Sequence, residues 1–413
     1  MKKFFIILLL IGLNFLSLIS YSQFSVNEYL SNAKNDIRLN ENKLKTDFLS
    51  DNPYRSPFLQ RVEFRARTNT IDVIEDDYRL RFGPTNPSEI KANKKYYQLE
   101  TNSLIFGYQY ALNKALRERY QLILSILSSI EKINLKEKEI LLQKDQLRIL
   151  EMELSDINFE VSDYIEQKEN LISLVFELNQ LKHNRNKLIL RIHSQYAFSG
   201  EINPSQIDMI SMDQIQHIMN LFPENLDTVN NIHIENLTQQ TILGEQRIRI
   251  EKAEGRRNIG YIQAEYDRLK GDEFTRHFGV QIGIRIPITN PDRPDLNRRT
   301  LNLMEDKNEI IEEKTLLEVQ CDLLRLDLSY LFEQRQLAST HLNDKQLIRL
   351  LNQDINLSPK GLLNAQKSLL RIQRMESNLR WDVYNTFIDY LYYSGKLVEM
   401  PLRNYISKDL NEL

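Results

Sequence analysis

The chain has 413 residues but only 12 glycines and 11 prolines, and so few turn-forming residues favour long secondary-structure elements. Its 54 lysines and arginines nearly balance 57 aspartates and glutamates, and the resulting net charge of -3 gives no indication of a nucleic-acid partner. With a single cysteine, Cys321, the chain cannot form an intramolecular disulfide, and we expect this residue to be a small buried apolar group in a helix.

Residues 1–22 have the pattern of a secretory signal peptide. Basic residues at Lys2 and Lys3 precede an apolar run, and Ser20 and Ser22 are small residues where a signal peptidase reads the chain. The alternative is an uncleaved anchor, although the run is short for a spanning helix and is interrupted by Asn14. No later run of about 18 apolar residues predicts a spanning helix. We therefore predict export and cleavage after residue 22.

The elements expected after the signal peptide alternate between long helices and short strands. The first half predicts a helix, two strands and two more helices, at 26–50, 61–68, 77–82, 88–154 and 161–193. The second half predicts the same order of elements, at 224–254, 258–266, 279–288, 292–351 and 360–395.

Short sequences recur in the two halves at a spacing of about 200 residues. Thr85-Asn86-Pro87 is repeated at 289–291, each time after a strand and before a long helix, and the stretch at 156–159 resembles the one at 354–357. The chain is therefore predicted to contain two tandem structural repeats. We divide it into the signal peptide, a first repeat, a connecting equatorial segment, a second repeat and a C-terminal tail, at 1–22, 23–205, 206–223, 224–395 and 396–413.

Each predicted strand has one apolar and one polar face. In FGVQIGIRIPITNP (278–291), Val280, Ile282 and Ile284 alternate with Gln281 and other polar or small residues. This period fits a half-buried sheet in water and equally a transmembrane barrel with lipid outside and water inside. Four strands do not close a transmembrane barrel, so a barrel would require several copies of the chain to pool their strands.

Apolar residues on the long helices recur at spacings of three and four. One seam contains Leu316, Val319, Leu323, Leu326 and Tyr330, and a second contains Leu317, Cys321, Leu324, Leu328 and Leu331. Two seams allow one helix to pack against a neighbour on each side, as in a curved wall of helices; the alternative is the broad apolar face of one globular bundle. A helix of about 60 residues would reach roughly 90 Å.

Signatures of catalysis, metal binding and nucleotide binding are missing from the sequence. The six histidines lack HExxH spacing, and the chain contains no Walker loop, GxGxxG or GxSxG motif. We therefore expect no enzyme activity, no cofactor and no metal site.

The signal peptide, the tandem halves, the strand pair before each long helix and the double seams together resemble the TolC family of outer-membrane efflux proteins. GVQIGIRIPITNP running into the helix at Asp292 is similar to the last strand and long helix of that family, and NLSPKGLLNAQKSLL (356–370) to its tip turn and returning helix. The fold implied is mixed and mainly α, with long coiled-coil helices forming an α-barrel and with four strands per chain in a trimeric twelve-stranded transmembrane β-barrel.

The resemblance implies an exit duct for a tripartite efflux or type I secretion system, which passively exports small molecules or polypeptides. It implies a homotrimer in outer-membrane lipid, with a periplasmic helical domain that meets an adaptor protein and an inner-membrane pump. The charge balance leads us to expect no nucleic-acid partner. The alternatives are a periplasmic coiled-coil adaptor, which would need a turn-rich β domain, and a structural envelope protein, which would not need four paired strands.

Two groups of site residues follow from the resemblance. If the apolar strand faces meet lipid, the residues expected to line the lumen are Arg61, Glu63, Arg65, Arg67, Asp77, Arg79, Arg81, Gln263, Glu265 and Arg285. This lumen would favour anionic solutes, unless its charges merely pair with one another. The tip residues expected to dock an adaptor are Asp156, Asn158, Phe159, Asp354, Asn356, Leu357 and Ser358, with Asn158 and Asn356 replacing the family's usual glycine.

Overall fold

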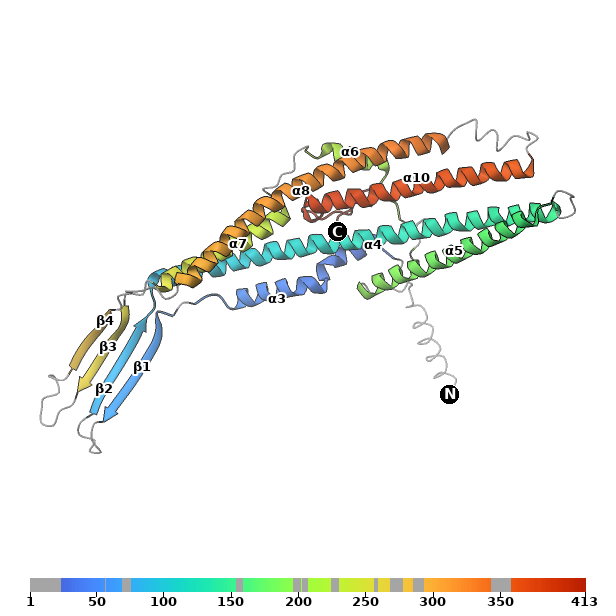
Figure 1. Ribbon diagram of the computed structural model, residues 1–413. Coiled ribbons are helices and arrows are strands. Elements are labelled where there is room, and N and C mark those ends of the chain that lie inside the picture. Colours follow the sequence, from blue (N-terminus) through green and yellow to red (C-terminus); the bar gives the residue numbers. More distant parts are fainter. Residues whose placement is uncertain are drawn as a thin grey trace, which may run out of the picture. The chain divides into compact units, whose positions relative to one another are not determined.

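A computed structural model contains long helices and one four-stranded sheet (Figure 1). It describes residues 24–55, 57–68, 76–153, 159–195, 202, 207–223, 230–255, 259–267, 278–284, 293–342 and 358–413. The signal peptide therefore lies outside the described residues. The described helices and strands are α2 (Val26–Ser31), η1 (Asn32–Asn35), α3 (Ile37–Asp51), β1 (Leu59–Thr68), β2 (Asp76–Pro84), α4 (Pro87–Met152), α5 (Val161–Gln195), α6 (Met212–Leu221), α7 (Ile232–Gly255), β3 (Ile259–Asp267), β4 (Phe278–Ile284), α8 (Arg293–Leu342), α10 (Pro359–Tyr393) and η5 (Lys396–Val398).

The chain divides into two compact units, each assembled from segments of both halves of the sequence. The first contains residues 1–36, 112–226 and 317–413, and the second contains residues 37–111 and 227–316. The long helices α4 and α8 each contribute to both units.

In the first unit, polar contacts join α5, α4, α10 and α8 in that order. Lys136 Nζ on α4 lies 2.6 Å from Glu177 Oε2 on α5, and on the other side of α4 the Trp381 indole of α10 donates to Glu131 at 2.7 Å. The last contact in this order joins α10 to α8, where Arg335 Nε of α8 lies 3.1 Å from Glu376 Oε1 of α10. These four helices follow one another as a wall of neighbouring helices, as the double seams predict.

The C-terminal tail packs into the first unit. Leu402 and Ile406 are buried, and the hydroxyl of Tyr120 on α4 donates to the Arg403 carbonyl at 2.9 Å and accepts from the Tyr405 backbone N–H at 3.1 Å. Burial raises the pKa of Tyr120 above its ordinary value. The tyrosine therefore remains protonated and holds the tail to the wall.

In the second unit, α7 joins the starts of α4 and α8. Gln246 on α7 donates to the Ala92 carbonyl of α4 at 2.7 Å, and Arg299 Nε of α8 lies 2.7 Å from Glu251 Oε1 of α7. Gly107 on α4 provides space for two neighbours, because a Cβ there would lie 3.5 Å from the Asn42 amide of α3 and 3.8 Å from that of Asn236 of α7. The helix order in this unit is α3, α4, α7 and α8.

The Thr85-Asn86-Pro87 motif joins the sheet to the helices of the second unit. Thr85 Oγ1 donates to the Pro57 carbonyl at 2.6 Å, and Asn86 Nδ2 donates to the Ala253 carbonyl of α7 at 3.0 Å. Asn86 Oδ1 also accepts from the Ser88 backbone N–H at 3.1 Å, so it satisfies a free donor in the first turn of α4. The second copy of the motif, at 289–291, lies outside the described residues.

Three predicted boundaries differ from the structure. The helix expected at 26–50 is two helices separated by η1, where Asp36 takes an extended conformation with its carboxylate 3.9 Å from Arg119 Nη2. The connecting segment at 206–223 contains a helix, α6, which begins with a capping box between Ser211 and Gln214. Helix α7 begins at Ile232, eight residues later than the predicted 224.

Candidate functional site: a sheet with two different faces

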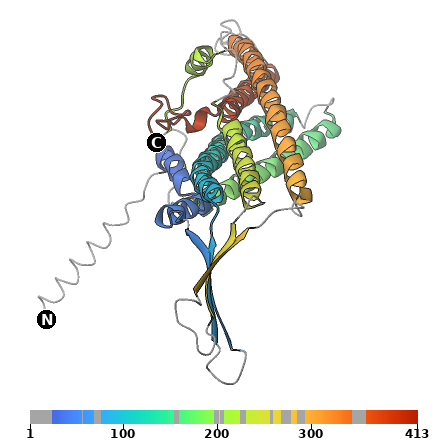
Figure 2. The same ribbon diagram turned by 90° about the vertical axis from the view of Figure 1, so that its left-hand side faces the viewer.

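All four strands pair antiparallel in the order β1-β2-β3-β4 (Figure 1). Figure 2 views the sheet from the side and shows its strands twisting across one another. Phe64 pairs with Leu80, Leu80 with Ala264 and Ala264 with Val280, so residues of like character lie in rows across all four strands. Because side chains alternate along a strand, this register gathers apolar and polar residues on opposite faces.

The apolar face is exposed in a single chain. Val280 is 72% exposed and Ile284 is 71% exposed on the edge strand β4. On the same face, Phe64 of the other edge strand, β1, is 67% exposed. An apolar sheet face of this kind is expected to be covered by lipid or by another protein. By register, it comprises Val62, Phe64, Ala66, Tyr78, Leu80, Phe82, Ile262, Ala264, Tyr266, Phe278, Val280 and Ile282, with Ile284 at the end.

Aromatic side chains gather near the hairpin ends of this face. Tyr78 pairs with Tyr266, which pairs with Phe278, so the three form one row across β2, β3 and β4. The Phe64 ring stacks on Tyr78 with their centroids 6.1 Å apart. A row of aromatic side chains at one end of an apolar band is typical of the membrane interface.

The polar face carries the residues predicted to line a lumen. The register places Arg61, Glu63, Arg65, Arg67, Arg79, Arg81, Gln263 and Glu265 on this one face, together with strand position 77, which is Asp77. Arg285 lies outside the described residues.

Gln263 is the centre of a polar network on this face and is buried among polar side chains. Its amide oxygen accepts from Arg81 Nε at 3.0 Å, and its amide nitrogen donates to Glu265 at 3.1 Å and to Gln281 at 3.3 Å. These contacts join β2, β3 and β4 through side chains.

Tyr261 and Gly283 make a close contact that was not predicted from the sequence. A Cβ at Gly283 would lie 2.3 Å from Tyr261 Cε1, so the ring of β3 lies across the glycine of β4. The Arg81 guanidinium lies over the same ring, 4.1 Å from its centroid. The sequence signal for such a contact is a glycine in one strand and an aromatic residue in the strand paired with it. The aromatic ring covers the backbone that the glycine leaves exposed.

We expect Gly283→Ala to lower the melting temperature of the assembled protein, because the Tyr261 ring must leave its position. In a double-mutant cycle, Tyr261→Ala with Gly283→Ala should cost less than the sum of the single changes, with a coupling of about 0.5–3 kcal/mol. Gly279→Ala is the matched control, since its Cβ would meet the flexible Glu265 side chain. Additive single changes in thermal unfolding would contradict the contact.

The outer helices of the wall carry exposed apolar seams. On α8, Val319, Leu323, Leu326 and Tyr330 are exposed, whereas Leu317, Cys321, Leu324 and Leu328 are buried against the unit. The two predicted seams thus lie on different faces of one helix, one exposed and one buried. At the other edge of the wall, α5 exposes Ile172, Val175 and Phe176.

Cys321 is buried, as predicted. Burial, with a smaller contribution from the nearby Asp322 carboxylate, raises the pKa of its thiol to about 12. The thiol is therefore protonated at neutral pH and unreactive.

Of the predicted tip residues, the structure describes Phe159 and Ser358. Ser358 caps α10, where its hydroxyl accepts from the Gly361 backbone N–H at 3.2 Å. Phe159 lies just before α5 and is partly buried. The others, Asp156, Asn158, Asp354, Asn356 and Leu357, lie outside the described residues.

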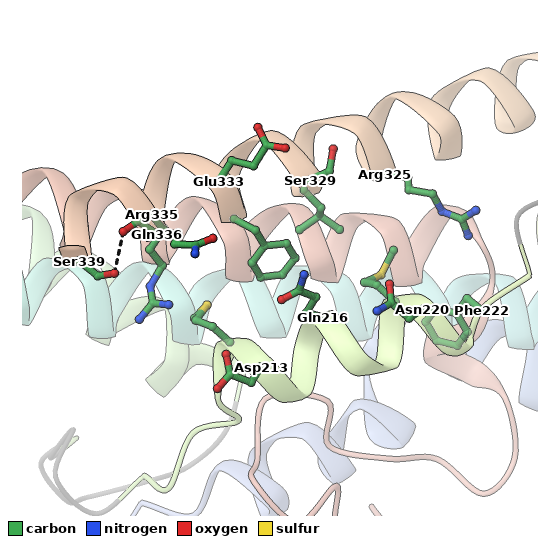
Figure 3. Close-up of a pocket in the computed structure, with 14 residues that line it drawn as sticks. Asp213, Gln216, Asn220, Phe222, Arg325, Ser329, Glu333, Arg335, Gln336 and Ser339 are labelled. Atoms are coloured by element: carbon green, nitrogen blue, oxygen red, sulfur yellow. Dashed lines mark hydrogen bonds between the residues drawn. The ribbon is translucent and has the colours of Figure 1, made fainter.

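A groove of about 870 Å³ lies between α6 and α8 (Figure 3). Gln216 and Asn220 line it from α6, and Arg325 and Arg335 from α8. Both arginines are already engaged, Arg325 with the Pro223 carbonyl at 2.7 Å and Arg335 with Glu376. We therefore assign this groove no ligand.

The described residues contain neither a metal site nor a helix able to span a membrane. No group of three or more histidine, cysteine, aspartate or glutamate side chains is placed there to hold a metal ion. In the same part of the chain, no helix combines the length and apolar character needed to cross a membrane.

This order of long helices and paired strands, with one four-stranded antiparallel sheet, is the fold of the TolC-like outer-membrane channels, as the sequence resemblance predicts. The outer-membrane channel MtrE of Neisseria gonorrhoeae is similar with a TM-score of 0.64 and 9% identity, over 90% of this chain and 88% of that one. VceC, an outer-membrane protein of Vibrio cholerae, is similar with a TM-score of 0.58 and 13% identity, over 91% and 97%.

CusC, whose structures concern folding and transmembrane channel formation, is similar with a TM-score of 0.63 and 12% identity, over 91% of this chain and 92% of that one. The sequence matches no protein-family model. A comparison with curated proteins gives no significant match.

Proposed function

We propose that this chain is the outer-membrane exit duct of a tripartite efflux or type I secretion system. Three copies would form a passive channel for small molecules or polypeptides, with no chemistry of its own. The observation that carries the proposal is the sheet itself, which exposes a band of aliphatic and aromatic residues on one face and gathers arginines, glutamates and glutamines on the other. A strand that separates lipid from a water-filled lumen requires this alternation.

The edges of the sheet support an assembly of several copies. Strands β1 and β4 are the two ends of the strand order, and each leaves one row of backbone groups to be paired. Unpaired backbone groups are too costly in a bilayer, so the sheet must close with strands from other copies. Three copies give twelve strands, which exceeds the smallest common barrel of eight.

The exposed seams of the helices support the same assembly. In the first unit the seams lie on α8 and α5, the two outer helices of the wall. In the second unit the outer helices are α3, with Leu44 and Phe48 exposed, and α8, with Leu301 and Ile311 exposed. Edges of this kind allow α8 of one copy to pack against α3 and α5 of the next, which closes a ring.

The proposed location is the outer membrane, with the helices in the periplasm after cleavage of residues 1–22. MtrE is an outer-membrane channel and VceC an outer-membrane protein, and both share this fold. The proposed partners are a periplasmic adaptor and an inner-membrane pump, and we propose that the adaptor docks at the predicted tip residues. We also propose that the tandem repeats at 23–205 and 224–395 each supply one strand pair and one pair of wall helices.

Reconstitution into planar bilayers tests the proposal. We expect the purified protein to open stable conductance steps without nucleotide, because a water-filled barrel needs no energy source. An adaptor or a structural coiled-coil protein would be recovered from the soluble periplasm and would give no steps. That result would overturn the duct.

A further inference from the structure

The charges on the polar face are unevenly distributed among the rows of the sheet. One row contains Arg65, Arg79 and Glu265 side by side, and the next contains Glu63, Arg81 and Gln263. Arg65 and Arg79 are therefore like charges placed directly opposite each other. Such a pair destabilises the association of two strands, so its presence suggests a functional role. The row nearest the hairpin turns contains positions 67, 77 and 267, whose residues Arg67, Asp77 and Asp267 add no positive excess.

Glu63 is covered by arginines. Arg61 and Arg65 both form ion pairs with it, the second at 3.0 Å. The Glu63 side chain is only 14% exposed, whereas the side chains of Arg61 and Arg65 are 72% and 57% exposed. A solute passing this face therefore meets the two cations and little of the carboxylate between them.

Arg81 is held in place by groups that do not neutralise it. Its Nε donates to the Gln263 amide oxygen at 3.0 Å, and its guanidinium lies over the Tyr261 ring. Neither of these two partners carries a negative charge, and Glu63, the carboxylate opposite Arg81 in the register, already forms ion pairs with Arg61 and Arg65. Glu265, the second glutamate of this face, lies opposite Arg79 and accepts a hydrogen bond from the neutral Gln263 amide.

We propose that these arginines make the duct select anionic cargo, an inference that rests on the proposed function. The three rows farther from the hairpin turns carry four arginines and two glutamates in each chain. They are Arg61, Arg65, Arg79 and Arg81, and Glu63 and Glu265. Closure of three copies repeats this excess around one lumen. Rings of arginine favour anions in a pore, because the narrow water-filled space screens charge less than bulk water does.

The reversal potential of the reconstituted channel under a KCl gradient tests the inference. We expect chloride to be more permeant than potassium. Arg65→Gln with Arg79→Gln should move the reversal potential toward that of a cation-selective pore, while Arg79→Lys, which keeps the charge, should leave it unchanged. Arg298→Gln is the matched control, since it removes the same charge from α8, where Arg298 pairs with Asp295 at 3.2 Å.

The outcomes separate the selectivity from the duct itself. A conducting wild-type channel that prefers potassium would overturn the anion preference and leave the proposed function standing. An unshifted reversal potential in the double variant, with its trimer intact in detergent, would also overturn it. If wild-type protein opens no conductance, the duct itself fails.

Discussion

Replacing Val280 by arginine is expected to abolish the trimer in the outer membrane. Val280 lies on the edge strand β4, in a central row of the apolar face, and is 72% exposed in the single chain, so in the proposed barrel its side chain meets lipid. An arginine on the lipid face near the midplane costs about 2–4 kcal/mol per copy, and the cost recurs in all three subunits. Trimer yield in detergent extracts of outer membranes measures the effect.

The neighbouring residue provides the matched control. Gln281 is also exposed but points to the opposite, polar face, so Gln281→Arg introduces the same charge into the lumen. We expect this variant to assemble at the wild-type level. Equal yields of the Val280→Arg and wild-type trimers would place the lipid-facing side elsewhere.

Replacing Leu326 by glutamate is expected to leave soluble or aggregated single chains in place of trimers. Leu326 is 65% exposed on the outer seam of α8, where the proposed ring places another subunit. Burial of a leucine contributes about 1.5–3 kcal/mol, and a buried unpaired carboxylate adds a further cost at each of three interfaces. Mass measurement in mild detergent would show the loss of the trimer.

Circular dichroism and a second variant distinguish assembly from folding. Because Leu326 is exposed in the single chain, its replacement should leave the helical signal unchanged. Gln336→Glu adds the same carboxylate to an exposed position of α8, about 100–120° around the helix from the middle of each seam, and we expect it to assemble normally. A Leu326→Glu protein with wild-type mass would show that the seam is not an interface.

The faces of the strands could be predicted from the sequence because they depend on local alternation alone. Val280 and Gln281 lie on opposite faces whichever strand pairs with theirs, so the predicted lumen residues of the described strands share one face. The two seams of α8 could be predicted for the same reason, because their spacing follows the helical period. The fold predicted from these patterns is confirmed by the solved channels that share it.

Features that depend on contacts between distant segments could not be predicted. The break at Asp36 is accompanied by the approach of Arg119, which lies more than 80 residues later in the chain. The Tyr261 ring lies over Gly283 only because β3 pairs with β4 in one register. Likewise, the sequence shows that Glu63 stands between two arginines. It does not show that these arginines cover the glutamate while their own side chains remain exposed.

The mass of the mature protein, purified from outer membranes in mild detergent, tests the central claim most directly. The full chain has a mass of 49.0 kDa, and we expect the detergent-corrected mass to equal three chains without the signal peptide. A trimer would make the exposed apolar sheet face part of one shared barrel. A soluble monomer recovered from the periplasm would contradict the account.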